Sequence, residues 1–226
     1  MSSDTRFLAL RLEGPMQSWG VDSQYNRRNT GLMPTKSAIA GMCCAALGLS
    51  RGCMAEQEFL SDFKRVKMTA IAIPGMNKWG KEIPVRRLQD YHTVQNTRTA
   101  EGKTKDCHIT HRQYLMDAAF GVVLEGDAAF LKKIEDALAD PEWGLWLGRK
   151  TCIPTAPILA GLKETESDAL RLLIGENHPD FFTRQMEMQN FEEGRDSLPD
   201  TPVSFAPDRR LFSPRRVMTI QQSEKI

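Results

Sequence analysis

The chain has 226 residues, of which 41% are hydrophobic and 26% charged, a composition typical of a folded globular protein with its own core. A formal net charge of +1 excludes the strongly basic, histone-like class but is compatible with a local nucleic-acid groove. Five cysteines without a Cys-x-x-Cys pair indicate reduced thiols in a cytoplasmic protein. No apolar run approaches the roughly 20 residues that a membrane helix needs, so we expect no membrane association.

The N-terminal part begins with a strand, a basic loop and a helix. Residues 7–12 alternate with the period of two that is typical of a strand. Residues 17–33 are polar, basic and glycine-bearing, which predicts a long loop. Residues 34–48 predict a helix, because Thr35 provides a start signal and Gly48 a stop.

The following elements determine the expected fold class. The patterns predict strands at 66–73 and 114–124, a helix at 127–139, and a protruding hairpin at 84–112 between the two strands. This order predicts an α+β fold, ferredoxin-like or RRM-like over residues 1–160, followed by a smaller β-rich region over residues 161–226.

Positive charge is concentrated in two segments of the chain. Residues 23–55 contain Arg27, Arg28, Lys36 and Arg51 without a single acid. A helix N-terminus beside such cations attracts phosphate, which indicates RNA contacts for Arg27, Arg28, Lys36 and Ser37. A solvated basic loop with an ordinary helix cap is the alternative. A second cluster, Arg209, Arg210, Arg215 and Arg216, is compatible with RNA, with a protein partner or with a solvated tail.

The predicted hairpin combines cations with flat side chains, a mixture suited to single-stranded RNA because cations neutralise phosphates while rings stack on bases. Its candidate RNA contacts are Arg86, Arg87, Tyr91, His92, Arg98, Lys103, Lys105, His108 and Arg112, with the ring of His111 close by. A solvated edge protected by charge is the alternative. Cys107, His108 and His111 lack a fourth ligand and a distant partner pair, so we expect neither a metal nor any other cofactor.

Two further segments contain candidate contacts. Gln17 offers an amide for unstacked bases, whereas Trp19 is expected to pack in the core. Gly148 opens a loop in which glycine lets the backbone approach RNA and Arg149 binds phosphate beside Lys150. The alternative for Arg149 is a brace through an internal carboxylate.

Four stretches together resemble the CasD family of type I-E CRISPR systems, a branch of the RAMP proteins. They are GPMQSWG (14–20), PTKSAIAGMCCAALG (34–48), LQDYHTV (88–94) and LGRKTCIPTAPI (147–158), and HRQYLMDAAF (111–120) is similar as well. The resemblance covers residues 7–158 and thins beyond residue 161. It implies an RRM-like RAMP domain with a hairpin thumb.

The resemblance also implies a function without catalysis and therefore without catalytic residues. The family's subunit binds the 5′ handle of the guide RNA, caps the backbone of the Cascade complex and supports RNA-guided DNA recognition in antiviral defence. Its partners would be the handle, the backbone subunit, the large subunit and, through the complex, target DNA.

Two other functions compete with this interpretation. Sister branches in type I-C systems cleave the repeat RNA, so a metal-independent endoribonuclease using Tyr25, Lys105 and His108 is the alternative. An unrelated RRM-like binder is disfavoured, since the sequence contains no aromatic-rich RNP strand.

Overall fold

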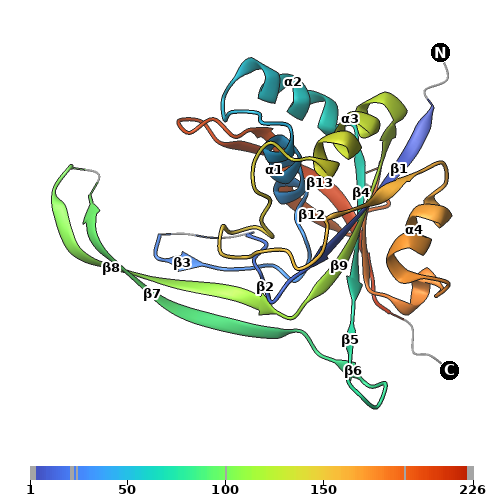
Figure 1. Ribbon diagram of the computed structural model, residues 1–226. Helices are drawn as coiled ribbons and strands as arrows, with labels where there is room; N and C mark the ends of the chain where they lie inside the picture. The colour runs from blue at the N-terminus through green and yellow to red at the C-terminus, as the bar shows by residue number, and fades with distance from the viewer. Residues whose placement is uncertain (1–3, 21–22, 24, 100, 191, 223–226) are drawn as a thin grey trace.

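A seven-stranded antiparallel sheet forms the centre of the protein (Figure 1). The computed structural model describes residues 4–20, 23, 25–99, 101–190 and 192–222. The sheet order is β10-β1-β9-β4-β11-β13-β12. The strands are β1 (Thr5–Glu13), β4 (Lys67–Ile73), β9 (Ala119–Asp127), β10 (Leu159–Lys163), β11 (Arg184–Glu187), β12 (Asp196–Ser204) and β13 (Leu211–Ile220).

Four of these strands and two helices have the ferredoxin-like arrangement. In chain order the elements are β1, α1 (Lys36–Ala46), β4, β9, α3 (Ala128–Ala139) and β10, and β9 lies between β1 and β4 in the sheet. This is the split β-α-β pattern of RRM-like proteins. The predicted α+β, RRM-like fold is therefore confirmed, and Thr35 caps α1 by accepting a hydrogen bond from the Ala38 N–H.

The remaining strands extend the same sheet beyond β4. Strand β10 includes residues on both sides of position 160, and β11, β13 and β12 continue the sheet from β4. The β-rich segment after residue 160 is thus continuous with the sheet of the first 160 residues.

Helices cover both faces of the sheet. In β1, Leu8, Leu10 and Leu12 belong to the core on the side of α1 and α3, while Ala9 and the partly buried Phe7 belong to the core on the side of α4 (Glu166–Ile174). Figure 1 shows α4 on the opposite side of the sheet from α1 and α3. Helix α2 (Met54–Phe63) packs beside α1, and a short 3-10 helix, η1 (Pro179–Phe181), follows α4. Helix α4 covers the face of the sheet on which an RRM stacks bases, so this face is closed.

A long hairpin extends away from this body (Figure 1). It consists of β7 (Arg86–Arg98) and β8 (Thr104–Met116), paired from end to end, so the predicted hairpin is confirmed; residue 100 lies outside the described residues. The single strand predicted at 114–124 is wrong, because the chain turns between β8 and β9. Asp117 has φ +51°, a left-handed conformation that aspartate tolerates.

Two short strands attach the N-terminal loop to this hairpin. They are β2 (Met16–Gln17) and β3 (Arg27–Arg28), and both pair with β8. The loop predicted at 17–33 is therefore anchored, although residues 21–22 and 24 lie outside the described residues. A separate small hairpin is formed by β5 (Gly75–Met76) and β6 (Glu82–Ile83).

Candidate nucleic-acid interface

The basic loop lies alongside the base of the hairpin. Strand β3 runs parallel to β8, with Arg27 opposite His111 and Arg28 opposite Arg112. The His111 N–H donates to the Asn26 carbonyl at 2.8 Å. Both side chains of β3 are exposed, so the structure adds two solvent-facing arginines to the hairpin surface.

Arg149 fastens this loop to the hairpin. Its Nη2 donates to the carbonyl oxygen of Arg28 at 2.7 Å, and its Nη1 to that of Gln113 at 3.0 Å. The guanidinium carbon also lies 4.7 Å from the centroid of the Tyr114 ring. Arg149 is therefore a brace, as the alternative interpretation held, although it acts through two backbone carbonyls rather than a carboxylate. The neighbouring Lys150 is exposed.

Gly148, next to Arg149, lets its loop approach the backbone of Ser18 in the N-terminal loop. Its φ is +95°, and a β-carbon at this position would lie 1.8 Å from the carbonyl oxygen of Ser18. The Ser18 N–H in turn donates to the Leu147 carbonyl at 3.1 Å. The glycine thus allows a close approach to the protein's own backbone, which corrects the expectation that it makes room for RNA.

The two faces of the hairpin differ in character. Strand alternation and the register place Arg87, Tyr91, His111 and Lys105 on one face. There the Tyr91 side chain is 61% exposed, and its ring meets the His111 ring edge-on, with centroids 5.4 Å apart. On the opposite face Thr110 and Tyr114 are buried. Leu115 on the Tyr91–His111 face is buried too, at the base of the hairpin, so this face is the more open one only beyond Leu115.

The cations of the hairpin divide into paired and unpaired groups. Arg86 contacts Asp117 at 2.7 Å and Lys103 contacts Glu101 at 3.2 Å. His92 lies 3.5 Å from Asp90, and Arg112 Nε donates to Thr110 Oγ1 at 3.1 Å. Within the described part of the chain, no ion pair is formed by Arg27, Arg28, Arg87, Arg98 or Lys105. These unpaired cations are the ones best suited to phosphates.

Gln17 and Trp19 are both core residues. The Gln17 side chain is fully buried, and its Nε2 donates to the carbonyls of Leu12 and Ala118 at 3.0 and 2.6 Å. The expected RNA contact of Gln17 is therefore corrected, since its amide joins β1 to the start of β9. Trp19 is also fully buried and packs edge-on against Phe120, as expected.

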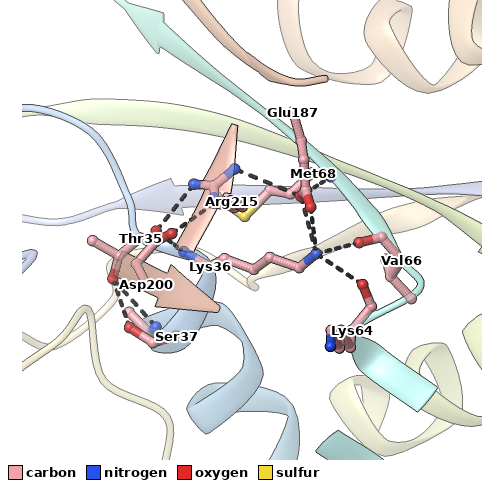
Figure 2. Close-up of polar contacts among 10 residues, drawn as sticks. Thr35, Lys36, Ser37, Lys64, Val66, Met68, Glu187, Asp200 and Arg215 are labelled. Atoms are coloured by element: carbon pink, nitrogen blue, oxygen red, sulfur yellow. Dashed lines mark hydrogen bonds and ion pairs between the residues drawn. The ribbon is translucent and has the colours of Figure 1, made fainter. Parts of the chain in front are cut away.

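Lys36 is buried rather than available to phosphate (Figure 2). Its Nζ lies 2.9 Å from Glu187 Oε1 and donates to the Val66 carbonyl at 2.6 Å. Burial lowers the pKa of Lys36, and the nearby Glu187 carboxylate only partly offsets this effect. The prediction of an RNA contact for Lys36 is corrected, because its charge is used inside the protein.

The N-terminus of α1 is likewise occupied by the protein itself. Asp200 Oδ2 accepts a hydrogen bond from the Lys36 N–H at 2.8 Å, which is the position where a phosphate was expected. Ser37 lies 3.3 Å from Thr35 through their hydroxyl oxygens (Figure 2). Ser37 lines a hollow beside α1, and no residue of the β7–β8 hairpin lines that hollow.

The arginines of the C-terminal basic cluster differ in exposure. Arg215 is buried, and its Nε lies 2.7 Å from Asp200 Oδ1 (Figure 2). Because β13 belongs to the central sheet, the solvated-tail interpretation is wrong. Arg209 and Arg210 are exposed at the turn between β12 and β13.

Two further features bear on catalysis and metals. Tyr25, Lys105 and His108 line one open hollow of about 450 Å³ with Asn26, Cys107 and Ile109. Strand alternation sends Cys107 and His111 to one face and His108 to the other. Among the described residues, no group of three or more His, Cys, Asp or Glu side chains is placed to hold a metal. None of the described helices is long and apolar enough to span a membrane.

The ring pair and the brace are the features that the sequence pattern left unspecified. Tyr91 and His111 are two of several rings in the segment, and nothing in their types indicates that they meet. A hairpin centred on Glu101 and Gly102 would place Tyr91 opposite Arg112, because residues equidistant from the turn lie opposite each other. In the structure the hairpin is centred on Glu101, so Tyr91 pairs with His111.

An RRM-like sheet with a hairpin thumb inserted between its second and third strands defines a protein of the RAMP class. The family model described as "CRISPR-associated protein (Cas_Cas5)" matches residues 7–218. The chain is 32% identical over 173 residues to the CRISPR system Cascade subunit CasD of Escherichia coli (strain K12), covering 74% of this chain and 75% of that protein. The chain therefore belongs to the CasD/Cas5 family of CRISPR-associated proteins.

Solved structures agree with this assignment. A chain of a structure described as a CRISPR RNA-guided surveillance complex has a TM-score of 0.75 and 29% identity, covering 96% of this chain and 90% of that one. A structure described as a crystal structure of a Cas protein has a TM-score of 0.66 and 30% identity, covering 94% and 93%.

Proposed function

We propose that this protein is a crRNA-binding subunit of a type I-E Cascade complex in the cytoplasm. In this proposal it holds the 5′ handle of the crRNA, caps the backbone and contacts the backbone and large subunits, which recognise target DNA. The names of its relatives support this role, since one is a Cascade subunit and another belongs to an RNA-guided surveillance complex.

The observation that carries the proposal is the open face of the hairpin. An exposed Tyr91 ring beside His111 offers a stacking surface, and Arg87, Lys105 and Arg27 offer unpaired charge on the same face. Arg28, opposite Arg112, presents its charge on the other face. Rings stack on bases while cations neutralise phosphates, which is how single strands are held without catalysis. The brace at Arg149 fixes the two parts relative to each other.

The endoribonuclease alternative is not favoured by these relatives. Tyr25, Lys105 and His108 nevertheless share one hollow, so RNA binding should be measured together with RNA integrity. We expect repeat RNA in EDTA to remain intact on a denaturing gel. Cleavage at the handle boundary that is lost in His108→Ala would contradict a purely binding role.

The test of the interface is the salt dependence of RNA affinity. The log–log slope for a single strand changes by about 0.7 for each phosphate contact. We expect Arg27→Ala with Arg28→Ala to flatten the slope by that amount for each arginine that contacts a phosphate. Lys133→Ala is the matched control, because Lys133 is an exposed cation on α3, away from the hairpin. An unchanged slope in the double variant would remove β3 from the interface.

A further inference from the structure

The small hairpin formed by β5 and β6 presents an exposed tryptophan. Figure 1 shows this β5–β6 hairpin extending beyond the end of the central sheet, between β4 and the start of β7. Trp79 lies in its turn and is 77% exposed. The ring belongs to neither of the two core clusters formed by the described residues. Trp79 therefore does not stabilise the core, and its place at the tip favours a role in binding.

The turn holds Trp79 in a fixed position. Asn77 Oδ1 accepts hydrogen bonds from the N–H groups of Trp79 and Lys81, both at 2.9 Å. The Asn77 N–H donates to the Lys81 carbonyl at 2.9 Å, and the Gly80 N–H donates to the Asn77 carbonyl at 3.0 Å. Lys78 Nζ lies 4.4 Å from the centroid of the Trp79 ring. Because the backbone around the ring is already ordered, binding through Trp79 costs less conformational entropy.

Further apolar side chains are exposed on the same hairpin and at its base. Met76, Ile83 and Val85 are 49%, 43% and 45% exposed. A hollow of about 350 Å³ lies at the base, and its walls include Ile73, Pro74, Ile83 and Val85. Single exposed apolar residues are ordinary on a protein surface, but a group of them gathered in one place marks an interaction site. The β5–β6 hairpin is therefore a candidate docking surface.

Two lysines give this surface its charge. Lys78 and Lys81 lie on either side of Trp79 in the turn, and both are exposed. Neither forms an ion pair with any residue that the structure describes. The acid of the hairpin, Glu82, accepts a hydrogen bond from Gln222 Nε2 at 3.0 Å, which ties the hairpin to the segment after β13. Positive charge around an apolar anchor is complementary to carboxylates around an apolar pocket.

We propose that the β5–β6 hairpin docks onto a neighbouring protein subunit. Trp79 enters an apolar pocket of that subunit, and carboxylates at the rim of the pocket pair with Lys78 and Lys81. This inference rests on the proposed function, since the partner belongs to the same complex. A protein is favoured over RNA, because the aliphatic side chains beside the ring neither stack on bases nor pair with phosphates. Protein interfaces, in contrast, combine aromatic and apolar anchors with a polar rim.

Photo-crosslinking identifies what covers the hairpin. The variant Trp79→p-benzoylphenylalanine keeps an aromatic group at position 79 and is assembled as the full chain with crRNA and the other subunits of its complex. We expect ultraviolet light to join it to one protein subunit, at a peptide that contains both apolar and acidic residues. The same group at Lys133, an exposed position on α3, should not label that peptide. Crosslinks to crRNA alone, to a second copy of this chain alone, or to nothing in an assembled complex would overturn the proposal.

Substitutions measure the strength of the contact. Trp79→Ala should raise about ten-fold the concentration of this chain that half-saturates a complex lacking it, as measured on native gels, because a buried tryptophan anchor dominates many interfaces. Lys78→Glu with Lys81→Glu should also weaken assembly, and this loss should shrink as salt rises, since salt screens charges at the rim. Lys133→Glu is the control and should assemble as the wild type does. Equal assembly of the wild type and Trp79→Ala would overturn the proposal.

RNA binding by the isolated chain separates this inference from the proposed function. Trp79→Ala should bind repeat RNA with the affinity and salt slope of the wild type, and its thermal unfolding should be unchanged because the ring is exposed. Weaker RNA binding by this variant would make Trp79 an RNA contact and overturn the protein partner. A wild-type chain that neither binds crRNA nor enters a complex would contradict both ideas. A wild-type chain that does both, while Trp79→Ala assembles equally well, would contradict the docking site alone.

Discussion

Arg149 donates a hydrogen bond to the backbone carbonyl of Arg28 at 2.7 Å, so one arginine positions the backbone that presents another. The Arg149 guanidinium also contacts Gln113 and the ring of Tyr114. A planar guanidinium can make all three contacts at once, whereas an ammonium group cannot. The relationship makes Arg149 a positioning residue for Arg28, which the proposed function places in contact with RNA.

Arg149→Lys tests this assignment. The substitution retains the charge but loses the two-carbonyl bridge, and a typical hydrogen bond contributes about 1 kcal/mol. We expect RNA affinity to fall about five-fold with an unchanged salt slope, because no phosphate contact is lost. Hydrogen exchange at β3 should accelerate. Affinity and exchange equal to those of the wild type would mean that the bridge is dispensable.

Gly148 can be tested against a second glycine of positive φ. Gly148→Ala would place its β-carbon 1.8 Å from the Ser18 carbonyl oxygen, whereas Gly102 at the hairpin tip has nothing within 4 Å. We expect Gly148→Ala to destabilise the fold by more than about 3 kcal/mol and Gly102→Ala by about 1 kcal/mol. Urea unfolding measures both. Equal losses of stability in the two variants would show that the positive φ, and not the clash with Ser18, determines the cost of the substitution.

Local patterns in the sequence predicted much of the fold. The period of β1, the Thr35 cap and the hairpin around Gly102 depend on neighbours in the chain, and the structure confirms them. The break between β8 and β9 was not predicted, because Asp117 lies within residues 114–124, whose pattern is typical of one continuous strand. Only tertiary contact explains it, since the Asp117 N–H donates to the Pro15 carbonyl.

The candidate site was harder to predict, because burial is decided by partners distant in sequence. Lys36 is sequentially close to Arg27 and Arg28, and its charge type is the same. Its partner Glu187 is 151 residues away, and nothing local indicates that the two meet. The same holds for Gln17, whose carbonyl partner on Ala118 is 101 residues away. Residue type therefore identified charge but not its exposure.

Lys36→Met should destabilise the fold strongly. Removing one partner from a buried ion pair costs about 3–5 kcal/mol, and Glu187 would keep only the more distant Arg215, whose Nη1 lies 3.6 Å away. Adding Glu187→Gln should recover most of the loss, because the neutral amide can still accept from the Met68 N–H, as Glu187 does at 3.2 Å. Thermal unfolding of both variants measures the difference. No recovery in the double variant would show that the Glu187 charge is stabilised by Arg215 alone.

The same lysine makes stability depend on pH. Burial lowers the pKa of Lys36 in the folded state below its ordinary value of 10.5. Between these two values the unfolded chain binds more protons, so the free energy of unfolding rises as pH increases through this window. We expect a positive slope as the pH rises toward 10.5 in the wild type and a smaller slope in Lys36→Met with Glu187→Gln. Identical slopes in the wild type and the double variant would show that groups other than Lys36 cause the pH dependence of stability.

The cysteines should differ sharply in reactivity. Burial, with help from the Glu56 and Cys53 charges, raises the pKa of the Cys44 thiol to about 12, and burial also raises the pKa of Cys43 and Cys152. Cys107 is exposed. At about pH 8 iodoacetamide should modify Cys107 within minutes and Cys44 only after unfolding, because the thiolate is the nucleophile. Peptide mass spectrometry gives the order, and early modification of Cys44 would contradict its burial.

Tyr91 separates stacking from charge at the proposed interface. Base–aromatic stacking contributes about 1–3 kcal/mol per base, so Tyr91→Leu should weaken binding of the single strand about ten-fold or more. Tyr91→Phe keeps the ring and should bind within about two-fold of the wild type. The salt slope should be the same in all three proteins, because none of them changes a phosphate contact. If leucine bound as well as phenylalanine, the hairpin would act through its cations alone, and the ring pair with His111 would be a packing contact within the hairpin.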